Sequence, residues 1–377
     1  MADPVLVVIF LRGGCDSLFM LAPSADADYL AARPDGLRVL RDGDRPGLIL
    51  PEALADVDFR LHPAAAELHE LFGAGDLSLI HATGLTDATR SHFDAEARIE
   101  RGASAGDAGG WLARWLAHAA PGGPLPALAV GAGMPESLRG SRAAVAPSLD
   151  ELMFLAGNGW SPALRARLGA GFGQHALTAT AAEMFALSDM LGSRIWSEAA
   201  GGVLPYAADV PYPEDSELSA PLMTVAQTIK QDLGLRIATV DYGGWDTHDD
   251  QASQFDRLAG GLSRALMAFW RDLGPRQQDV CVVVQSEFGR RLRSNESGGT
   301  DHGRAGAMMV LGPQAKGGRL LGRWPGLSNE TLEEGADLAV TTDYRDVLAE
   351  VLTGHMGLTD VAAVFPGLTP APLGLYR

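Results

Sequence analysis

The sequence predicts an α/β fold, a three-layer sandwich in which helices cover both faces of a mostly parallel central sheet. Two observations predict it. Short apolar runs bounded by Gly, Asp or Ser recur along the chain, and they are continuous rather than alternating, as in strands buried on both faces. Segments with helical spacing of apolar residues lie between these runs, and strands that alternate with helices indicate a sheet between helical layers.

Six apolar runs are the predicted strands, and three longer segments are the predicted helices. The strands are VLVVIF (5–10), LSLIHAT (77–83), LPALAVG (125–131), LRIATVDYG (235–243), DVCVVVQSE (279–287) and GAMMVLG (306–312). The helices span 62–75, 249–274 and 343–357. The first helix ends in glycine, a usual C-cap, and the last opens at Asp343, a residue type favoured at N-caps.

The chain is predicted to form a single domain over residues 1–377, with a cap or insertion at about 100–230 on the rim of the sheet. That stretch is rich in Ala, Gly and Pro, and it contains a helix-like piece, 178–191, and a Pro-containing connector, 204–217. The length suits one large domain or two ordinary ones.

Composition argues against several classes of partner. The 30 basic and 47 acidic residues give a net charge of −17 without any basic run, so we expect neither nucleic acid nor a membrane to bind. Two cysteines are too few for a disulfide framework. No signal peptide is visible, so the chain is expected to be cytoplasmic, or periplasmic if an export signal has been removed. The oligomeric state is left open.

Polar loops follow four of the predicted strands, although the strands themselves carry almost no charge. In open α/β sheets, ligands bind beyond the carboxyl ends of the strands. Asp, Glu and His are ligands that Zn²⁺, Mn²⁺ or Mg²⁺ accept, so the loops predict a site for one or two divalent ions, with helix N-caps as the alternative for Asp94 and Asp249. The candidate ligands are Asp16, Asp246, His248, Glu287, Asp301 and His302.

Two further features complete the predicted site. Asp301 and His302 diverge unless the backbone bends, which the nearby glycines permit. In TDATRSHFDAE, Thr89 and Ser91 are candidate nucleophiles at a strand-to-helix turn, and Arg90 is a possible oxyanion clamp. Helix capping is the alternative role for both hydroxyls, and His92 is either a ligand or packed under the loop.

Four segments together resemble one known family. LRGGCDSL, RSHFDAE, GGWDTHDDQ and SEFGRRLRSN…GTDHG, in this order, resemble the bacterial family called domain of unknown function 1501, grouped with the alkaline phosphatase-like superfamily. The resemblance runs from the first strand to TTDYRDVLAEVLTG. It implies an alkaline phosphatase-like fold and transfer or hydrolysis at phosphate or sulfate esters, using one or two divalent metals and a Ser, Thr or modified Cys nucleophile.

The resemblance also implies roles for particular residues. Asp16 resembles the carboxylate that opens the superfamily's metal site, the TRSHF turn lies where the nucleophile would be, and Asp246 with His248 resembles the next ligand loop. The triplet DHG at 301–303 resembles a ligand motif of the superfamily. It comes 14 residues after Glu287, which occupies the strand end instead.

The sequence departs from the superfamily in two further places. Asp246 and His248 are two residues apart, whereas the corresponding pair is normally four apart. Cys15 is followed by DSLF rather than x-Pro-x-Arg, which disfavours a formylglycine sulfatase.

The leading hypothesis is a metal-dependent hydrolase or transferase whose substrate is a small anionic phosphate- or sulfate-type ester. Ser91 or Thr89 would attack, and Arg90 or Arg290 would hold the oxyanion. The region at about 100–230 would set substrate choice. The alternatives are a non-catalytic binding or scaffold protein on a degenerate phosphatase-like fold, and a metalloenzyme of another class, such as an oxidase or lyase.

Overall fold

The six predicted strands all form, and they build one large sheet. In the computed structural model, which describes residues 3–51, 57–103, 109–119, 122–153, 161–173 and 177–376, the strand order is β15-β5-β14-β11-β1-β10-β6-β7, with β16 also paired to β5. The strands are β1 (Val5–Leu11), β5 (Leu77–Gly84), β6 (Ala127–Val130), β7 (Ala144–Val145), β10 (Ile237–Tyr242), β11 (Val280–Ser286), β14 (Gly306–Leu311), β15 (Leu320–Leu321) and β16 (Thr342–Asp343).

One strand of this sheet runs against the others. Within the part of the chain that the structure describes, β14 pairs antiparallel with both β11 and β5, whereas the remaining pairs of the sheet are parallel. β14 therefore begins at the edge where its neighbours end. The prediction of a mostly parallel sheet is confirmed.

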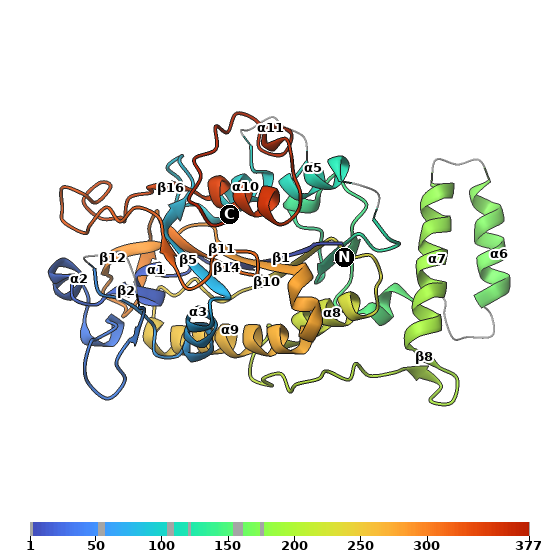
Figure 1. The fold of residues 1–377 in the computed structure, drawn as a ribbon, viewed down its shortest axis with the longest axis horizontal. Helices are drawn as coiled ribbons and strands as arrows, with labels where there is room; N and C mark the ends of the chain where they lie inside the picture. Colours follow the sequence, from blue (N-terminus) through green and yellow to red (C-terminus); the bar gives the residue numbers. More distant parts are fainter. Residues whose placement is uncertain are drawn as a thin grey trace.

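Helices cover both faces of the sheet, because the side chains of each buried strand alternate between two cores. In β1, Val5, Val7 and Ile9 belong to one apolar cluster, and Leu6 and Val8 belong to the other. The first cluster includes residues of α3 (Ala66–Ala74), α8 (Ser219–Lys230) and α9 (Gln251–Leu273), and the second includes residues of α4 (His92–Arg101), α5 (Trp111–His118), α10 (Tyr344–Gly354) and α11 (Val361–Val364). Figure 1 shows α3 and α9 below the sheet and α10 and α5 above it, the predicted three layers.

The three helices expected from the sequence are α3, α9 and α10. α3 ends at Gly75, whose φ of 82° is the left-handed conformation that favours glycine. The carboxylate of Asp343 accepts a hydrogen bond from the backbone N–H of Arg345, so it caps α10. No helix among the described residues is long and apolar enough to cross a membrane.

The region at about 100–230 contributes to two parts of the molecule. β6, β7, α5 and α8 belong to the main sheet and its covering layers. α6 (Ser161–Phe172) and α7 (Thr178–Ile195) form a pair that projects from the body, followed by the hairpin of β8 (Trp196–Ser197) and β9 (Gly202–Val203) (Figure 1). The pair projects on the side where β1 begins. A role for this region in substrate choice stays a prediction.

Smaller elements surround the other end of β1. They are α1 (Ser17–Met20), α2 (Ala27–Ala32), a small sheet of β2 (Leu21–Pro23), β3 (Leu48–Ile49) and β4 (Phe59–Leu61), and the antiparallel pair of β12 (Arg290–Ser294) and β13 (Thr300–His302).

Candidate metal centre

Three histidines and one aspartate meet at the carboxyl edge of the sheet. His92 is the first residue of α4, which follows β5, and Asp246 and His248 lie in the loop after β10. His302 ends β13, shortly before the reversed strand β14 begins. The direction of β14 explains why the DHG segment reaches this edge from the start of a strand rather than from its end.

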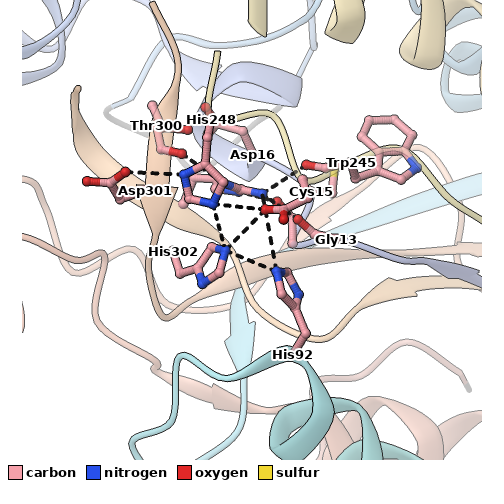
Figure 2. Close-up of polar contacts among 12 residues, drawn as sticks. Gly13, Cys15, Asp16, His92, Trp245, His248, Thr300, Asp301 and His302 are labelled. Atoms are coloured by element: carbon pink, nitrogen blue, oxygen red, sulfur yellow. Dashed lines mark hydrogen bonds and ion pairs between the residues drawn. The ribbon is translucent and has the colours of Figure 1, made fainter. Parts of the chain in front are cut away.

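The three imidazole rings point at one another (Figure 2), and Asp246 contacts all three. Nε2 of His302 lies 3.0 Å from Nε2 of His92 and 2.9 Å from Nε2 of His248. Oδ1 of Asp246 lies 3.1 Å from Nε2 of His302, 3.0 Å from Nε2 of His248 and 3.4 Å from Nε2 of His92. We call these four residues the His-Asp cluster.

The other ring nitrogen of each histidine fixes the tautomer. Nδ1 of His92 lies 2.7 Å from a carboxylate oxygen of Glu287, and Nδ1 of His248 lies 3.2 Å from Oδ1 of Asp301. Nδ1 of His302 lies 2.9 Å from the carbonyl oxygen of Arg90. A carbonyl or an ionised carboxylate can only accept, so each Nδ1 carries the proton and donates it. In the neutral rings, each Nε2 then presents a lone pair to the cluster.

This donor set fits a divalent cation. Three nitrogen lone pairs and a carboxylate oxygen at such short separations repel one another, and a cation between them removes the repulsion. Ligating imidazoles in zinc sites donate their second nitrogen to a carboxylate or carbonyl, as all three do here. Ligands about 2.0–2.1 Å from a tetrahedral zinc ion lie roughly 3.3 Å from one another, which is close to the five separations given above. The ligand atoms of His92, Asp246 and His302 all lie within 4.8 Å of one another, and His248 joins this group through His302 and Asp246.

The surroundings of the cluster keep its carboxylates ionised but shift the pKa values of two histidines in opposite directions. Burial opposes ionisation of Asp246, but the hydrogen bond from Arg290 and the charge of its guanidinium lower the pKa of Asp246 to about 2. Burial likewise opposes ionisation of Glu287, yet hydrogen bonds from His92 and the backbone N–H of Gly13 lower its pKa. Burial lowers the pKa of His302, which favours its neutral, ligating form. The hydrogen bond to Glu287 raises the pKa of His92, which favours its protonated form, so a cation bound there would displace that proton.

Glu287 and Asp301, both predicted ligands, lie behind the histidines. Glu287 is fully buried, and one of its oxygens accepts from Gly13 N–H at 2.8 Å as well as from His92. Asp301 also accepts a hydrogen bond from Asn295, which is the main reason its pKa is lowered. Both carboxylates therefore orient imidazoles.

Arg290 ties the surrounding loops together from a fully buried position. Its guanidinium donates to the carbonyl oxygens of Gly13, Gly14 and Thr300 at 2.5, 2.7 and 2.7 Å. It also donates to Oδ1 of Asp246 at 2.6 Å. The guanidinium nitrogens of Arg290 are thus already hydrogen-bonded to the loops that carry the cluster. The predicted role of Arg290 in holding an oxyanion is therefore not supported.

Asp16 is not brought into the His-Asp cluster. It is fully buried, and Arg33 donates to both of its oxygens at 2.7 and 2.9 Å. The same carboxylate caps α1, and it accepts from the side chain of Gln251 at 2.6 Å. Each oxygen therefore already has partners.

The three predicted residues of the TRS turn have different surroundings. Ser91 is exposed at the N-cap of α4 and makes no capping hydrogen bond through its side chain. The hydroxyl of Thr89 accepts from the backbone N–H of Ser91 at 3.3 Å. The guanidinium of Arg90 pairs with Glu334 and Asp337, so within the described contacts only its backbone carbonyl touches the cluster.

His92 was left open by the sequence, and the structure makes it a member of the cluster. One sequence feature could have identified His92 as a candidate ligand: it lies at the start of a helix, and Glu96 follows one helical turn later. His92, Glu96 and Glu287 also form a second group with possible ligand atoms close together. Glu287 already accepts a hydrogen bond from His92. We therefore interpret the group of His92, Glu96 and Glu287 as residues that hold His92 in place for the His-Asp cluster, not as a second metal site.

Solved structures with some similarity to this chain are distant. A structure of Ps i-CgsB in complex with k-i-k-neocarrahexaose is 9% identical, with a TM-score of 0.42 and a match covering 97% of this chain and 74% of that one. The zinc complex of the C-terminal periplasmic domain of EcEptC from Escherichia coli is 6% identical, with a TM-score of 0.37 and coverage of 83% and 74%. Alkaline phosphatase from the Antarctic bacterium TAB5 is 10% identical, with a TM-score of 0.34 and coverage of 83% and 92%.

No curated protein matches the sequence. A family model does match, over residues 79–368, and its description is "Protein of unknown function (DUF1501)". The match spans most of the chain and includes all four residues of the His-Asp cluster. The chain therefore belongs to the DUF1501 family.

Proposed function

We propose that this protein is a metal-dependent hydrolase or transferase that acts on phosphate- or sulfate-type esters. The observation that carries the proposal is the convergence of three Nε2 atoms and one carboxylate oxygen in the His-Asp cluster. The ester class rests on the resemblance of the GGWDTH, SEFGR and DHG segments to the alkaline phosphatase-like superfamily.

The donor set favours zinc over the other predicted ions. Imidazole nitrogen suits Zn²⁺, whereas Mg²⁺ prefers oxygen ligands and retains waters. We propose one ion, held by His92, Asp246, His248 and His302. When bound, such an ion lowers the pKa of a coordinated water or hydroxyl and polarises an ester oxygen.

Other residues of this chain would orient the ligands and supply the nucleophile. Glu287, Asp301 and the Arg90 carbonyl hold the three imidazoles in orientation, and Arg290 holds Asp246. Ser91 is the better candidate nucleophile because its hydroxyl is exposed and makes no capping bond, whereas Thr89 already accepts a hydrogen bond. The side chains of Asp246 and His248 are 48% and 41% exposed, so an ester in solution can reach the cluster.

Metal analysis tests the proposal most directly. Protein purified without chelator is expected to contain one equivalent of zinc, measured by mass spectrometry of the metal. Asp246→Ala and His302→Ala are expected to lose the metal and the activity together. His118→Ala is the matched control, because that imidazole is exposed at the end of α5, outside the cluster.

A substrate screen separates the alternatives. Phosphomonoesters, phosphodiesters and sulfate esters are tested with zinc, manganese and magnesium in turn. Turnover of one ester class that depends on His302 and Ser91 supports the hydrolase. Bound metal without turnover of any ester favours the binding protein. The absence of bound metal, together with no thermal shift on adding metals, would contradict both the cluster and the enzyme.

A further inference from the structure

A second candidate binding site lies at the opposite end of β10 from the His-Asp cluster. Arg236 directly precedes β10, and its backbone N–H donates to the carbonyl of Pro126, next to β6. A six-residue strand is roughly 20 Å long, so the two sites are well separated. Two surface cavities, of about 310 and 350 Å³, share Arg236 and Ala119 in their walls.

The side chain of Arg236 is buried but only partly satisfied. The residue is 7% exposed, and its Nε donates to the carbonyl oxygen of Pro4 at 3.0 Å. The nearest carboxylate oxygen, from Asp3, is 4.0 Å from Nη1, too far for a hydrogen bond. Among the described residues, neither terminal nitrogen has a hydrogen-bond acceptor.

Two other buried arginines of this chain have hydrogen-bond acceptors at both terminal nitrogens. The forks of Arg33 and Arg290 donate to carboxylates and carbonyls on several sides. Because Arg236 lines both cavities, its terminal nitrogens open to solvent there rather than being sealed in the core. An anion that enters a cavity can therefore accept hydrogen bonds from this free end.

The surroundings define the chemistry of that ligand. The guanidinium carbon of Arg236 lies 5.2 Å from the centre of the Trp115 ring, so an aromatic face holds the fork in place. The first cavity is lined in part by the apolar residues Ala113, Leu116 and Pro126. An arginine fork matches the two oxygens of a carboxylate. The carboxylates of Asp3 and Asp360, which lie nearby, oppose an anion of higher charge.

We propose that this face binds a small organic monocarboxylate. The carboxylate accepts hydrogen bonds from the terminal nitrogens of Arg236, and the apolar body lies against Ala113, Leu116 and Pro126. The site is independent of the proposed hydrolase activity, since it shares no residue with the His-Asp cluster.

Titration calorimetry with sodium benzoate tests the proposal on the full chain. Wild-type protein is expected to bind benzoate, and Arg236→Lys is expected to bind at least 10-fold more weakly because it keeps the charge but loses the fork. Ala119→Glu is expected to abolish binding, because it places a carboxylate of the protein beside Arg236. His302→Ala, which disables the His-Asp cluster, is expected to bind benzoate as the wild type does.

Three outcomes would overturn the proposal: no binding by the wild type, equal affinity in Ala119→Glu, or binding lost in His302→Ala. Inorganic phosphate is the second probe, and a site that binds phosphate but not benzoate would contradict the carboxylate assignment. If Arg236→Lys proves unfolded by circular dichroism, Ala119→Glu decides the question, since the methyl side chain of Ala119 has no polar contact to lose.

Discussion

Glu287 is a buried carboxylate that orients one ligand of the proposed metal site from behind. It accepts hydrogen bonds from Nδ1 of His92 at 2.7 Å and from the backbone of Gly13 at 2.8 Å. Glu287→Gln keeps the shape but removes the charge that makes His92 a stronger base. Removing such an outer partner typically lowers metal affinity by about 10–100-fold, and we expect a loss of that size in a competition assay with a chromogenic chelator.

Glu296→Gln is the control for this change, because Glu296 is exposed and lies in the connection between β12 and β13. Unchanged zinc affinity in Glu287→Gln would contradict the role proposed for the carboxylate.

Asp16 and Arg33 form a fully buried ion pair, and its removal is expected to affect folding rather than metal content. Asp16→Ala leaves Arg33 buried without its partner, which costs about 3–5 kcal/mol of unfolding free energy. Urea unfolding measures the loss, and zinc content is expected to stay at one equivalent.

Asp256→Ala removes the partner of Arg45 in an exposed pair, with side chains 40% and 61% exposed, so it is the matched control. Its cost is expected to be below about 1 kcal/mol. Zinc lost from Asp16→Ala while its stability stays unchanged would make Asp16 a ligand after all.

These residues show how far sequence reasoning can reach. Asp246, His248 and His302 could be selected because polar residues after apolar runs gather at one edge of a parallel sheet. Asp16 follows the same rule, yet its burial against Arg33, 17 residues away, depends on tertiary packing that no local pattern reveals. His92 was ambiguous because a histidine at a helix start can either ligate a metal or pack under the loop.

The β12–β13 pair is the element that delivers His302. Its pairing sets Arg290 opposite His302, and the chain turns back through Gly298 and Gly299. A Cβ at Gly299 would lie 2.3 Å from the carbonyl carbon of His248. The two loops of the cluster therefore touch backbone to backbone at this glycine.

Gly299→Ala is expected to push these loops apart. We expect weaker zinc binding and a loss of roughly 1–3 kcal/mol in unfolding free energy, the usual cost of overpacking. Gly73→Ala in α3 is the control, because a Cβ there meets nothing within 4 Å, and it is expected to stabilise the helix by roughly 0.5–1 kcal/mol. Wild-type zinc affinity in Gly299→Ala would show that the loops are not held by this contact.

The strands of the sheet were predictable, but the direction of β14 was not. Continuous apolar runs report burial on both faces, and GAMMVLG has this pattern whichever way it runs. Direction depends on the length and path of the connection after β11, which here folds into the β12–β13 pair. Because β14 is reversed, the DHG segment lies before a strand instead of directly after one, and it still reaches the His-Asp cluster.

The whole molecule is expected to lose stability in mild acid. Burial lowers the pKa of His62 and of His81 to about 4, whereas an unfolded histidine has a pKa of about 6.5. Between these values the unfolded chain binds protons that the folded chain does not, so unfolding becomes easier as the pH falls from about 6.5 to 4.

His81→Gln tests this dependence, since it removes one titrating group. Urea midpoints measured from pH 7 to 4 are expected to fall less steeply in this variant than in the wild type. His118→Gln, at an exposed histidine, is expected to keep the wild-type slope. Equal slopes in all three proteins would show that the acid sensitivity has another origin.

The reversed strand β14 also affects when the site can assemble during synthesis. His302 lies 210 residues after His92, so the ribosome releases the last member of the cluster long after the first. β14 lies between β5 and β11 in the sheet, and His302 lies directly before it in the chain. A nascent chain that ends before β13 therefore lacks one ligand of the proposed ion, so the complete ligand set forms only after most of the protein has been made.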